Sequence, residues 1–558
     1  MKYSAIIPMV ALVAVSAGGC KKSDFVEDNT NPDVIYSIKP QEQFLNASIR
    51  AHNSDFEAYY DYYRRMMPWA QQTTDVSGNG KNFLNDVGNF NQRYGVFYPQ
   101  LGSTLTDIAE IIKLMPDDQK GNYTSIAAIA DIPKINYAFY VSDVNGSIAY
   151  SEAFQARYGG SLVPAYETQQ SLFALWDTRL KEVIGILKGS QTNQVSLDKY
   201  DQYFNGDVTK WIKAANALRL RIAFRLLKRD ENTAKGIIAD VLSNDADLMS
   251  SNDDSWVMFA DVSFTSGGNW NPTGLRAPKP TVDFMWNNSD PRIRLFYQQN
   301  NYSQSNIDEG ITAGVLGAGT VEQSRRYIGA VISPDSSAGK YKSWFQTKKV
   351  SDALTLDTVS YLQYRMWQPA FASSTGSAGT GNSFFPVITY AEYCFMRAEA
   401  IVKGYSSGDA EEWYNNGVTA SIEFYDNAAK KAKLENYADL GATEIADYLN
   451  SPDVKYDASK ALEQIAIQAY INFYKEPNEA WALYKRTGMP NKNTALANED
   501  IVVDGGVKDV PRRASINIPL PTDRDFETRG AALDAMKADP DFGTSPSDMF
   551  GRIWWDKK

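Results

Sequence analysis

Residues 207–226 read DVTKWIKAANALRLRIAFRL and carry a strong helical pattern. Apolar side chains recur every three to four residues, as on one face of an α-helix. Asp207 precedes the pattern and suits the capping position of a helix N-terminus. Arg219, Arg221 and Arg225 lie off the apolar face, and we interpret them as partners of acidic residues on adjacent helices rather than as ligand contacts. The apolar face consists of Trp211, Ala215, Leu218, Ile222 and Leu226.

A second helical pattern covers Tyr390 to Val402, and Gly404 is placed to end it. Small alanines on its apolar face would let another helix approach closely, and a partner helix is expected to start at Asp409. Paired helices of this kind indicate hairpins like those of tetratricopeptide (TPR) proteins, although no regular repeat period is present. The apolar face consists of Ala391, Cys394, Phe395, Ala398 and Ile401.

Similar patterns predict helices over much of the chain, so we expect a mostly α fold. Residues 250–386 differ because they contain long Gly-, Ser- and Asn-rich stretches, and residues 488–558 are mostly irregular. Loops of this length are often functional. The expected helices are 40–67, 100–115, 121–143, 166–188, 208–229, 231–243, 388–403, 409–429 and 459–487.

The N-terminus has the features of a secretory signal peptide at residues 1–19. Lys2 is followed by an apolar run over residues 5–15, which is too short to span a bilayer, and by small residues up to Cys20. A cysteine in this position indicates a bacterial lipoprotein, although Ala17 stands where leucine is usual. We expect Cys20 to carry the lipid and residues 20–38 to form a tether. An ordinary signal peptide with an incidental cysteine is the alternative.

Composition excludes several classes of function. The 558 residues have a net charge of −11 and no basic stripe, so nucleic acid is not an expected partner. Two cysteines make a disulfide framework impossible, and no spacing typical of a metal site or a cofactor loop occurs. The single histidine, His52, lies in a polar helical stretch and is interpreted as a surface residue. Most hydrolase chemistry is therefore disfavoured, except schemes that use two carboxylates.

Six segments, in chain order, resemble motifs of the SusD/RagB family of outer-membrane lipoproteins. Ala149, Ser147 and Lys485 depart from the family pattern at positions that concern turns of the scaffold. The segments are 142–153 (SDVNGSIAYSEA), 211–225, 290–292 (DPR), 390–400 (YAEYCFMRAEA), 481–490 (WALYKRTGMP) and 554–556 (WWD).

The resemblance implies one SusD-like domain over residues 39–558. Its TPR-like helical-hairpin scaffold would cover about 40–245 and 387–487, and a loop-rich, ligand-facing region would cover about 250–386 and 488–558. It also implies a nutrient-binding protein without catalysis. No cofactor is expected, and no residue is assigned as a metal ligand. Such a protein would be lipid-anchored in the cell outer membrane, exposed at the surface, and would form the lid of a SusC-like TonB-dependent transporter. Its ligand would be an oligosaccharide.

Aromatic and amide side chains in the loops are the candidate ligand contacts, because sugars present C–H faces and hydroxyl groups. Trp270 is the first candidate, since Asn269 and Asn271 flank it. Trp69 and Gln71 follow the first long helix, where the family can contribute contacts. The remaining candidates, all within the loop-rich region, are Trp256, Trp344 and Trp367, whereas Trp211, Trp481, Trp554 and Trp555 are assigned to the scaffold.

Two alternatives remain at the level of sequence. The first is a peptide-binding member of the same family, which would favour charged groups over an aromatic platform. The second is a glycoside hydrolase with two carboxylates facing each other across a cleft. The sequence shows no such geometry, and with 67 acidic residues chance pairs are inevitable.

The lipoprotein interpretation predicts that Cys20→Ala releases the protein from the membrane, because the variant has no thiol to acylate. Fractionation of cells that express wild type and variant measures this. Membrane association of the variant equal to that of wild type would contradict a lipid anchor at Cys20.

Overall fold

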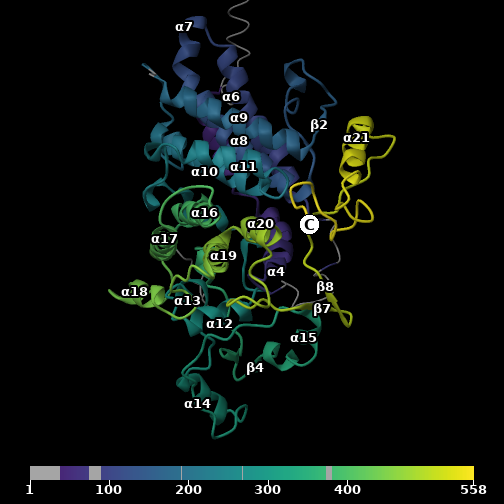
Figure 1. Ribbon diagram of the computed structural model, residues 1–558. Coiled ribbons are helices and arrows are strands. Elements are labelled where there is room, and N and C mark those ends of the chain that lie inside the picture. Colours follow the sequence, from purple (N-terminus) through teal and green to yellow (C-terminus); the bar gives the residue numbers. More distant parts are fainter. Residues whose placement is uncertain (1–37, 75–83, 85–88, 190–191, 267, 372–379) are drawn as a thin grey trace, which may run out of the picture.

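The computed structural model describes residues 38–74, 84, 89–189, 192–266, 268–371 and 380–558. Helices dominate it, as predicted (Figure 1). Helices α6 to α11 occupy one end of the molecule, α16 to α20 the middle, and α12 to α15 the other end (Figure 1). Cys20, the signal peptide and all but the last residue of the tether lie outside the described residues. No described helix is both long enough and apolar enough to cross a bilayer.

The scaffold is built from helices that pack against their neighbours in sequence: α8 on α9, α10 on α11, and α16 on α17. These contacts form the predicted TPR-like hairpins. The longer helices are α3 (Pro40–Arg50), α6 (Ser103–Lys113), α8 (Thr124–Asn145), α9 (Gln169–Lys188), α10 (Val208–Leu226), α11 (Glu231–Val241), α16 (Tyr390–Val402), α17 (Ala410–Lys431), α19 (Ala461–Asn472), α20 (Pro477–Thr487) and α21 (Phe526–Lys537).

Short helices and two-stranded ribbons make up the rest of the regular structure. Each described strand pair is antiparallel: β1 with β2, β3 with β6, β4 with β5, and β7 with β8. The short helices are α4 (Met67–Trp69), α5 (Gln92–Val96), α7 (Asp117–Lys120), α12 (Lys279–Asn287), α13 (Ile293–Phe296), α14 (Gln304–Thr312), α15 (Pro334–Ala338), α18 (Glu444–Leu449), and the π-helices η1 (Glu57–Met66) and η4 (Phe97–Gly102). The strands are β1 (Ile148–Ala149), β2 (Tyr166–Glu167), β3 (Trp256–Ala260), β4 (Lys348–Lys349), β5 (Thr355–Leu356), β6 (Ser383–Ile388), β7 (Ile501–Val503) and β8 (Gly506–Lys508).

Two expected helices are broken in the structure. The helix expected over 40–67 ends at Arg50, and the chain turns into a new helical segment where Ser54 Oγ accepts a hydrogen bond from the Glu57 amide at 3.2 Å. The helix expected over 459–487 ends at Asn472, and α20 begins at Pro477. Proline has no amide hydrogen and disfavours helical geometry in the residue before it, so it starts a helix more readily than it continues one.

Helix α10 confirms the predictions made for residues 207–226. Asp207 Oδ1 accepts hydrogen bonds from the amides of Thr209 and Lys210 at 2.9 and 3.2 Å. The apolar face is buried, and Trp211 is fully enclosed. Arg219 pairs with Asp177 on α9 and with Asp240 on α11, both at 2.7 Å.

The other two arginines of α10 form a buried ion network between four helices. Arg221 binds both carboxylate oxygens of Glu392 on α16, at 2.8 and 2.5 Å. Arg225 binds Asp143 on α8 at 2.9 Å and Glu479 on α20 at 2.5 Å. Burial alone would raise the pKa of Glu479, but Arg221 and Arg225 outweigh it and hold that pKa below its ordinary value.

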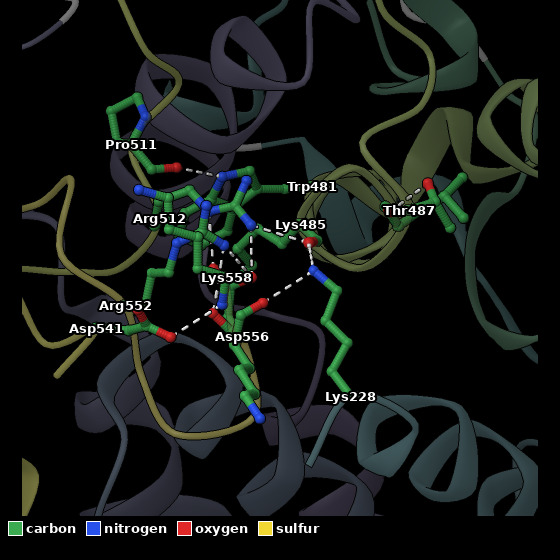
Figure 2. Close-up of polar contacts among 12 residues, drawn as sticks. Lys228, Trp481, Lys485, Thr487, Pro511, Arg512, Asp541, Arg552, Asp556 and Lys558 are labelled. Atoms are coloured by element: carbon green, nitrogen blue, oxygen red, sulfur yellow. Dashed lines mark hydrogen bonds and ion pairs between the residues drawn. The ribbon is translucent and has the colours of Figure 1, made fainter. Parts of the chain in front are cut away.

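The C-terminal residues are fastened to the scaffold by a second polar cluster (Figure 2). Asp556 accepts hydrogen bonds from both Arg512 and Arg552. Arg512 also donates to the Lys485 carbonyl at 2.8 Å, which ties the segment to α20. The neighbouring Trp481 donates its indole N–H to the Pro511 carbonyl at 2.7 Å (Figure 2). The family-like segments 481–490 and 554–556 thus meet in space as structural elements.

Removing one partner of the buried network should destabilise the protein strongly. Arg221→Met leaves Glu392 buried without its cation, which typically costs about 3–5 kcal/mol of unfolding free energy. The control Lys181→Met breaks an exposed pair with Asp240 and should cost below about 1 kcal/mol. Denaturant unfolding measures both variants. Equal, small losses would contradict the structural role given to Arg221.

Candidate functional site

Three of the predicted ligand contacts lie in the interior instead. Trp69 is 1% exposed, and its ring packs 5.0 Å from Phe90 and 5.3 Å from Trp481. Gln71 exchanges two hydrogen bonds with the backbone of Glu499, at 2.8 and 2.9 Å. Trp256, on β3, is 1% exposed and packs against Trp211. These side chains have no surface open to a ligand, so their assignment is corrected to the scaffold.

Trp270 and Trp367 line a cavity of about 110 Å³ whose walls include residues of η1 and β6. The Trp270 ring stands edge-on to Phe385, with 5.8 Å between centroids. The Trp367 indole N–H donates to the Tyr474 hydroxyl at 2.9 Å. Neither flanking asparagine lines this cavity: the Asn269 amide donates to Asp55, and Asn271 accepts from the Thr273 amide. The predicted grouping of Trp270 with both asparagines around one ligand is therefore absent.

His52 also lines this cavity and is half-buried, so it is less exposed than the sequence led us to expect. Its Nε2 lies 2.9 Å from the Tyr203 hydroxyl, and its ring stacks on Phe385 with 5.0 Å between centroids. Burial, together with the nearby Lys475, lowers the pKa of His52 to about 3. The imidazole is therefore neutral at physiological pH.

The charged groups around this cavity have strongly shifted pKa values. Burial raises the pKa of Glu57 to about 8, and the neighbouring Asp61 adds to the shift. Burial lowers the pKa of Lys475 to about 7, while its Nζ donates to the Met366 and Phe384 carbonyls at 2.9 and 2.8 Å. The Glu57 carboxyl accepts a hydrogen bond from Tyr137 at 2.8 Å. At about 110 Å³, the cavity is smaller than the several hundred Å³ usual for ligand sites.

A much larger groove, of about 770 Å³, opens in the loop-rich region. Its walls come from the α13 segment, from the turn around Arg326, from residues 361–371 and from the loop after α17. Ligand sites for molecules of moderate size usually have volumes of several hundred Å³. The lining residues are Thr273, Arg294, Gln298, Gln299, Asn301, Arg326, Tyr327, Tyr361, Gln363, Tyr364, Arg365, Phe371, Leu434, Glu435 and Asn436.

Three half-buried rings, Tyr361, Tyr364 and Phe371, form an aromatic ledge along this groove. Ring centroids are 5.8 Å apart between Tyr361 and Tyr364, and 4.7 Å apart between Tyr364 and Phe371. The Arg276 guanidinium lies 3.8 Å from the centre of the Tyr361 ring, while the Tyr361 hydroxyl donates to Asp357. Burial and that hydrogen bond raise the pKa of Tyr361 to about 12, so the hydroxyl stays protonated at physiological pH.

Polar side chains surround the ledge, and their charges are already matched within the protein. Arg294 binds both oxygens of Glu444 at 2.7 and 2.8 Å, Arg326 binds Glu322 at 2.8 Å, and Arg365 binds Glu435 at 3.0 Å. Gln299 and Asn436 are exposed at the rim. The groove therefore offers ring faces, amides and hydroxyls with little uncompensated charge.

The sequence does contain the aromatic residues of this ledge, in the segment 361–371 (YLQYRMWQPAF). The ligand contact predicted from this segment is Trp367, but its ring is 3% exposed and points into the core. The tyrosines and Phe371 of the same segment face the groove. Trp344, the last candidate, is half-buried against Tyr341 and lines neither the cavity nor the groove.

Comparison with known families matches residues 32–513 to SusD-like proteins, described as starch-binding and associating with the outer membrane. The chain belongs to this SusD-like family. Membership confirms the resemblance identified from the six sequence segments. No curated protein gives a significant match.

Solved structures confirm the SusD-like fold. A chitin-binding protein, 21% identical, aligns with a TM-score of 0.69 over 93% of this chain and 100% of its own. A SusD homologue from Bacteroides fragilis, 20% identical, gives 0.65 over 92% and 100%. A chitin-binding SusD homologue from Flavobacterium johnsoniae, 18% identical, gives 0.62 over 93% and 98%.

The shifted pKa of Glu57 predicts a pH-dependent stability. Between about pH 4.5 and 8 the Glu57 carboxyl keeps a proton in the folded protein that it has lost in the unfolded chain, so the contribution of Glu57 to stability falls as pH rises through this range. Glu57→Gln removes this titration. As pH rises, the unfolding free energy of the variant should therefore increase relative to that of wild type, by up to about 1.4 kcal/mol per pH unit. Denaturant unfolding at pH 5 and pH 8 measures it.

The surface variant Glu412→Gln is the control for this experiment, and it should leave the pH dependence of unfolding as in wild type. A Glu57→Gln variant with that same unchanged dependence would show that Glu57 is ionised in the folded protein.

Proposed function

We propose that this SusD-like protein binds an oligosaccharide in the groove and delivers it to a SusC-like TonB-dependent transporter in the outer membrane. It acts as a lipoprotein anchored through Cys20 at the cell surface, and it does not catalyse a reaction. The observation that carries the proposal is the aromatic ledge of Tyr361, Tyr364 and Phe371 inside an open groove lined by amides.

Ring faces and amides are the groups that a sugar requires. The C–H face of a pyranose packs against an aromatic ring, and its hydroxyls exchange hydrogen bonds with amide and hydroxyl groups. Tyr361 and Tyr364 supply rings, and Gln299 and Asn436 supply amides at the rim. The chitin-binding proteins of the same fold, described above, support a carbohydrate as the ligand class.

The groove favours a glycan over the two alternatives. A peptide would be recognised through free charges, but Arg294, Arg326 and Arg365 are each engaged with a carboxylate. Hydrolysis by two carboxylates requires a facing pair. Among the described residues that line the groove, Glu435 is the only acidic one, and it is paired with Arg365.

The ledge predicts the effect of removing one ring. Tyr364→Ala should weaken glycan binding about tenfold, because a single aromatic contact contributes about 0.5–1.5 kcal/mol in addition to the area it buries. Calorimetry of the purified protein against malto-oligosaccharides, chito-oligosaccharides and a peptide panel measures this.

Tyr158→Ala is the matched control, since Tyr158 is 38% exposed and is not part of the groove lining. Its affinity should equal that of wild type. Glycan binding that Tyr364→Ala leaves intact would place the site elsewhere, and binding of peptides alone would favour the peptide-uptake alternative.

A further inference from the structure

A basic and aromatic segment lies beside the groove. Residues 339–350 read GKYKSWFQTKKV and contain four lysines and no acidic residue, in a chain whose net charge is −11. They follow α15 and include the short helix η12 (Lys342–Phe345) and strand β4. In Figure 1, β4 lies between α14 and α15, at the end of the molecule opposite α7. We call Lys340, Lys342, Lys348 and Lys349 the lysine strip.

The strip is exposed and mostly without ion-pair partners. All four lysines are exposed, and Lys349 pairs with Asp352 at 2.7 Å. Within the described part of the chain, Lys340, Lys342 and Lys348 form no salt bridge, in contrast to the three arginines of the groove. The strip therefore presents positive charge that an external anion can approach.

Aromatic rings accompany these charges. Tyr341 and Trp344 are half-buried and meet edge to face, with 4.9 Å between centroids. Lys340 Nζ lies 5.1 Å from the centre of the Tyr341 ring. Ring surface next to ammonium groups suits a ligand that has both apolar faces and negative charges.

The Lys348–Lys349 end of the strip meets the groove through the β4–β5 ribbon, whereas Lys340 and Lys342 lie farther along the strip, in the segment that packs against α15. Lys349 is paired with Thr355, and Lys348 with Leu356. The Thr355 carbonyl accepts a hydrogen bond from the side chain of Asn301, which also accepts from the Asp357 amide at 2.7 Å. Asn301 is itself part of the groove lining. One strand therefore separates Lys348 and Lys349 from the wall of the groove.

We infer that the lysine strip binds the acidic groups, carboxylates or sulfates, of an oligosaccharide whose neutral rings lie on the aromatic ledge. The inference rests on the proposed function, and it makes the ligand an acidic glycan. Because the strip meets the groove at one end, it would also fix which end of the oligosaccharide carries the acidic groups. Continuity with a sugar-sized groove favours a glycan over an anionic membrane.

The test compares the full mature chain with a triple variant, Lys340→Gln, Lys342→Gln and Lys348→Gln. The acidic probes are a heparin octasaccharide and an oligogalacturonate, and the neutral probes are a malto- and a chito-oligosaccharide. Calorimetry at 25 and 300 mM NaCl separates charge from packing, because salt screens exposed charges. The matched control is Lys455→Gln, Lys460→Gln and Lys508→Gln, three exposed lysines that form no salt bridge in the described chain.

At low salt, the strip variant should lose about tenfold or more in affinity for an acidic probe, since each exposed ion pair contributes up to about 1 kcal/mol. The control variant should bind as wild type does, and neutral probes should not distinguish the variants. Circular dichroism verifies that the variants are folded.

Equal affinity of strip variant and wild type for both acidic probes would overturn the inference. If wild type binds phosphatidylglycerol vesicles but no acidic glycan, and the strip variant loses the vesicle binding, the strip would be assigned to a membrane surface instead. In both cases the proposed function stands if wild type binds neutral glycans and Tyr364→Ala weakens that binding. Failure of every glycan to bind would overturn the proposed function together with the inference.

Discussion

The buried ion network of α10 is the constraint on which the rest of the structure depends. Arg221 and Arg225 are withdrawn from water, and a buried charge is tolerable only where a partner is held against it. Glu392, Glu479 and Asp143 supply those partners from three other helices, so the four helices have one acceptable arrangement. An alternative packing of these helices would leave at least one buried charge uncompensated. The network therefore favours this helix arrangement over others.

The groove is attached to this network through a short path of contacts. Glu479 lies on α20, and Tyr474 precedes that helix. The Tyr474 ring stacks on Phe296 of α13 with 3.9 Å between centroids, and its hydroxyl accepts a hydrogen bond from the indole N–H of Trp367. The two segments that form the groove, around α13 and over residues 361–371, are thereby positioned by one tyrosine. A rigid helical scaffold in this way holds irregular loops in the geometry that a ligand needs.

Most of the tryptophans predicted as ligand contacts lie in the core, whereas the rings of the groove are three tyrosines and one phenylalanine. Trp69, Trp256, Trp270 and Trp367 are at most 8% exposed, because the largest apolar rings gain most from burial. The groove instead uses Tyr361, Tyr364 and Tyr327, whose hydroxyl groups tolerate water while their rings remain available. Tryptophan is a poor mark of the proposed sugar site here because a loop-rich sequence does not imply exposure: Trp256 is buried on strand β3, and Trp270 packs against Phe385 of β6.

The sequence by itself determined the helical scaffold, its family, the cap at Asp207 and the ion-pair role of the α10 arginines, since periodicity and capping are local properties of a chain. It did not reveal that His52 lines a cavity, or which rings of residues 361–371 face outward. Those outcomes required tertiary structure, because the groove joins segments more than a hundred residues apart, from Thr273 to Asn436. Exposure of a side chain depends on what packs above it, and only the folded arrangement decides that.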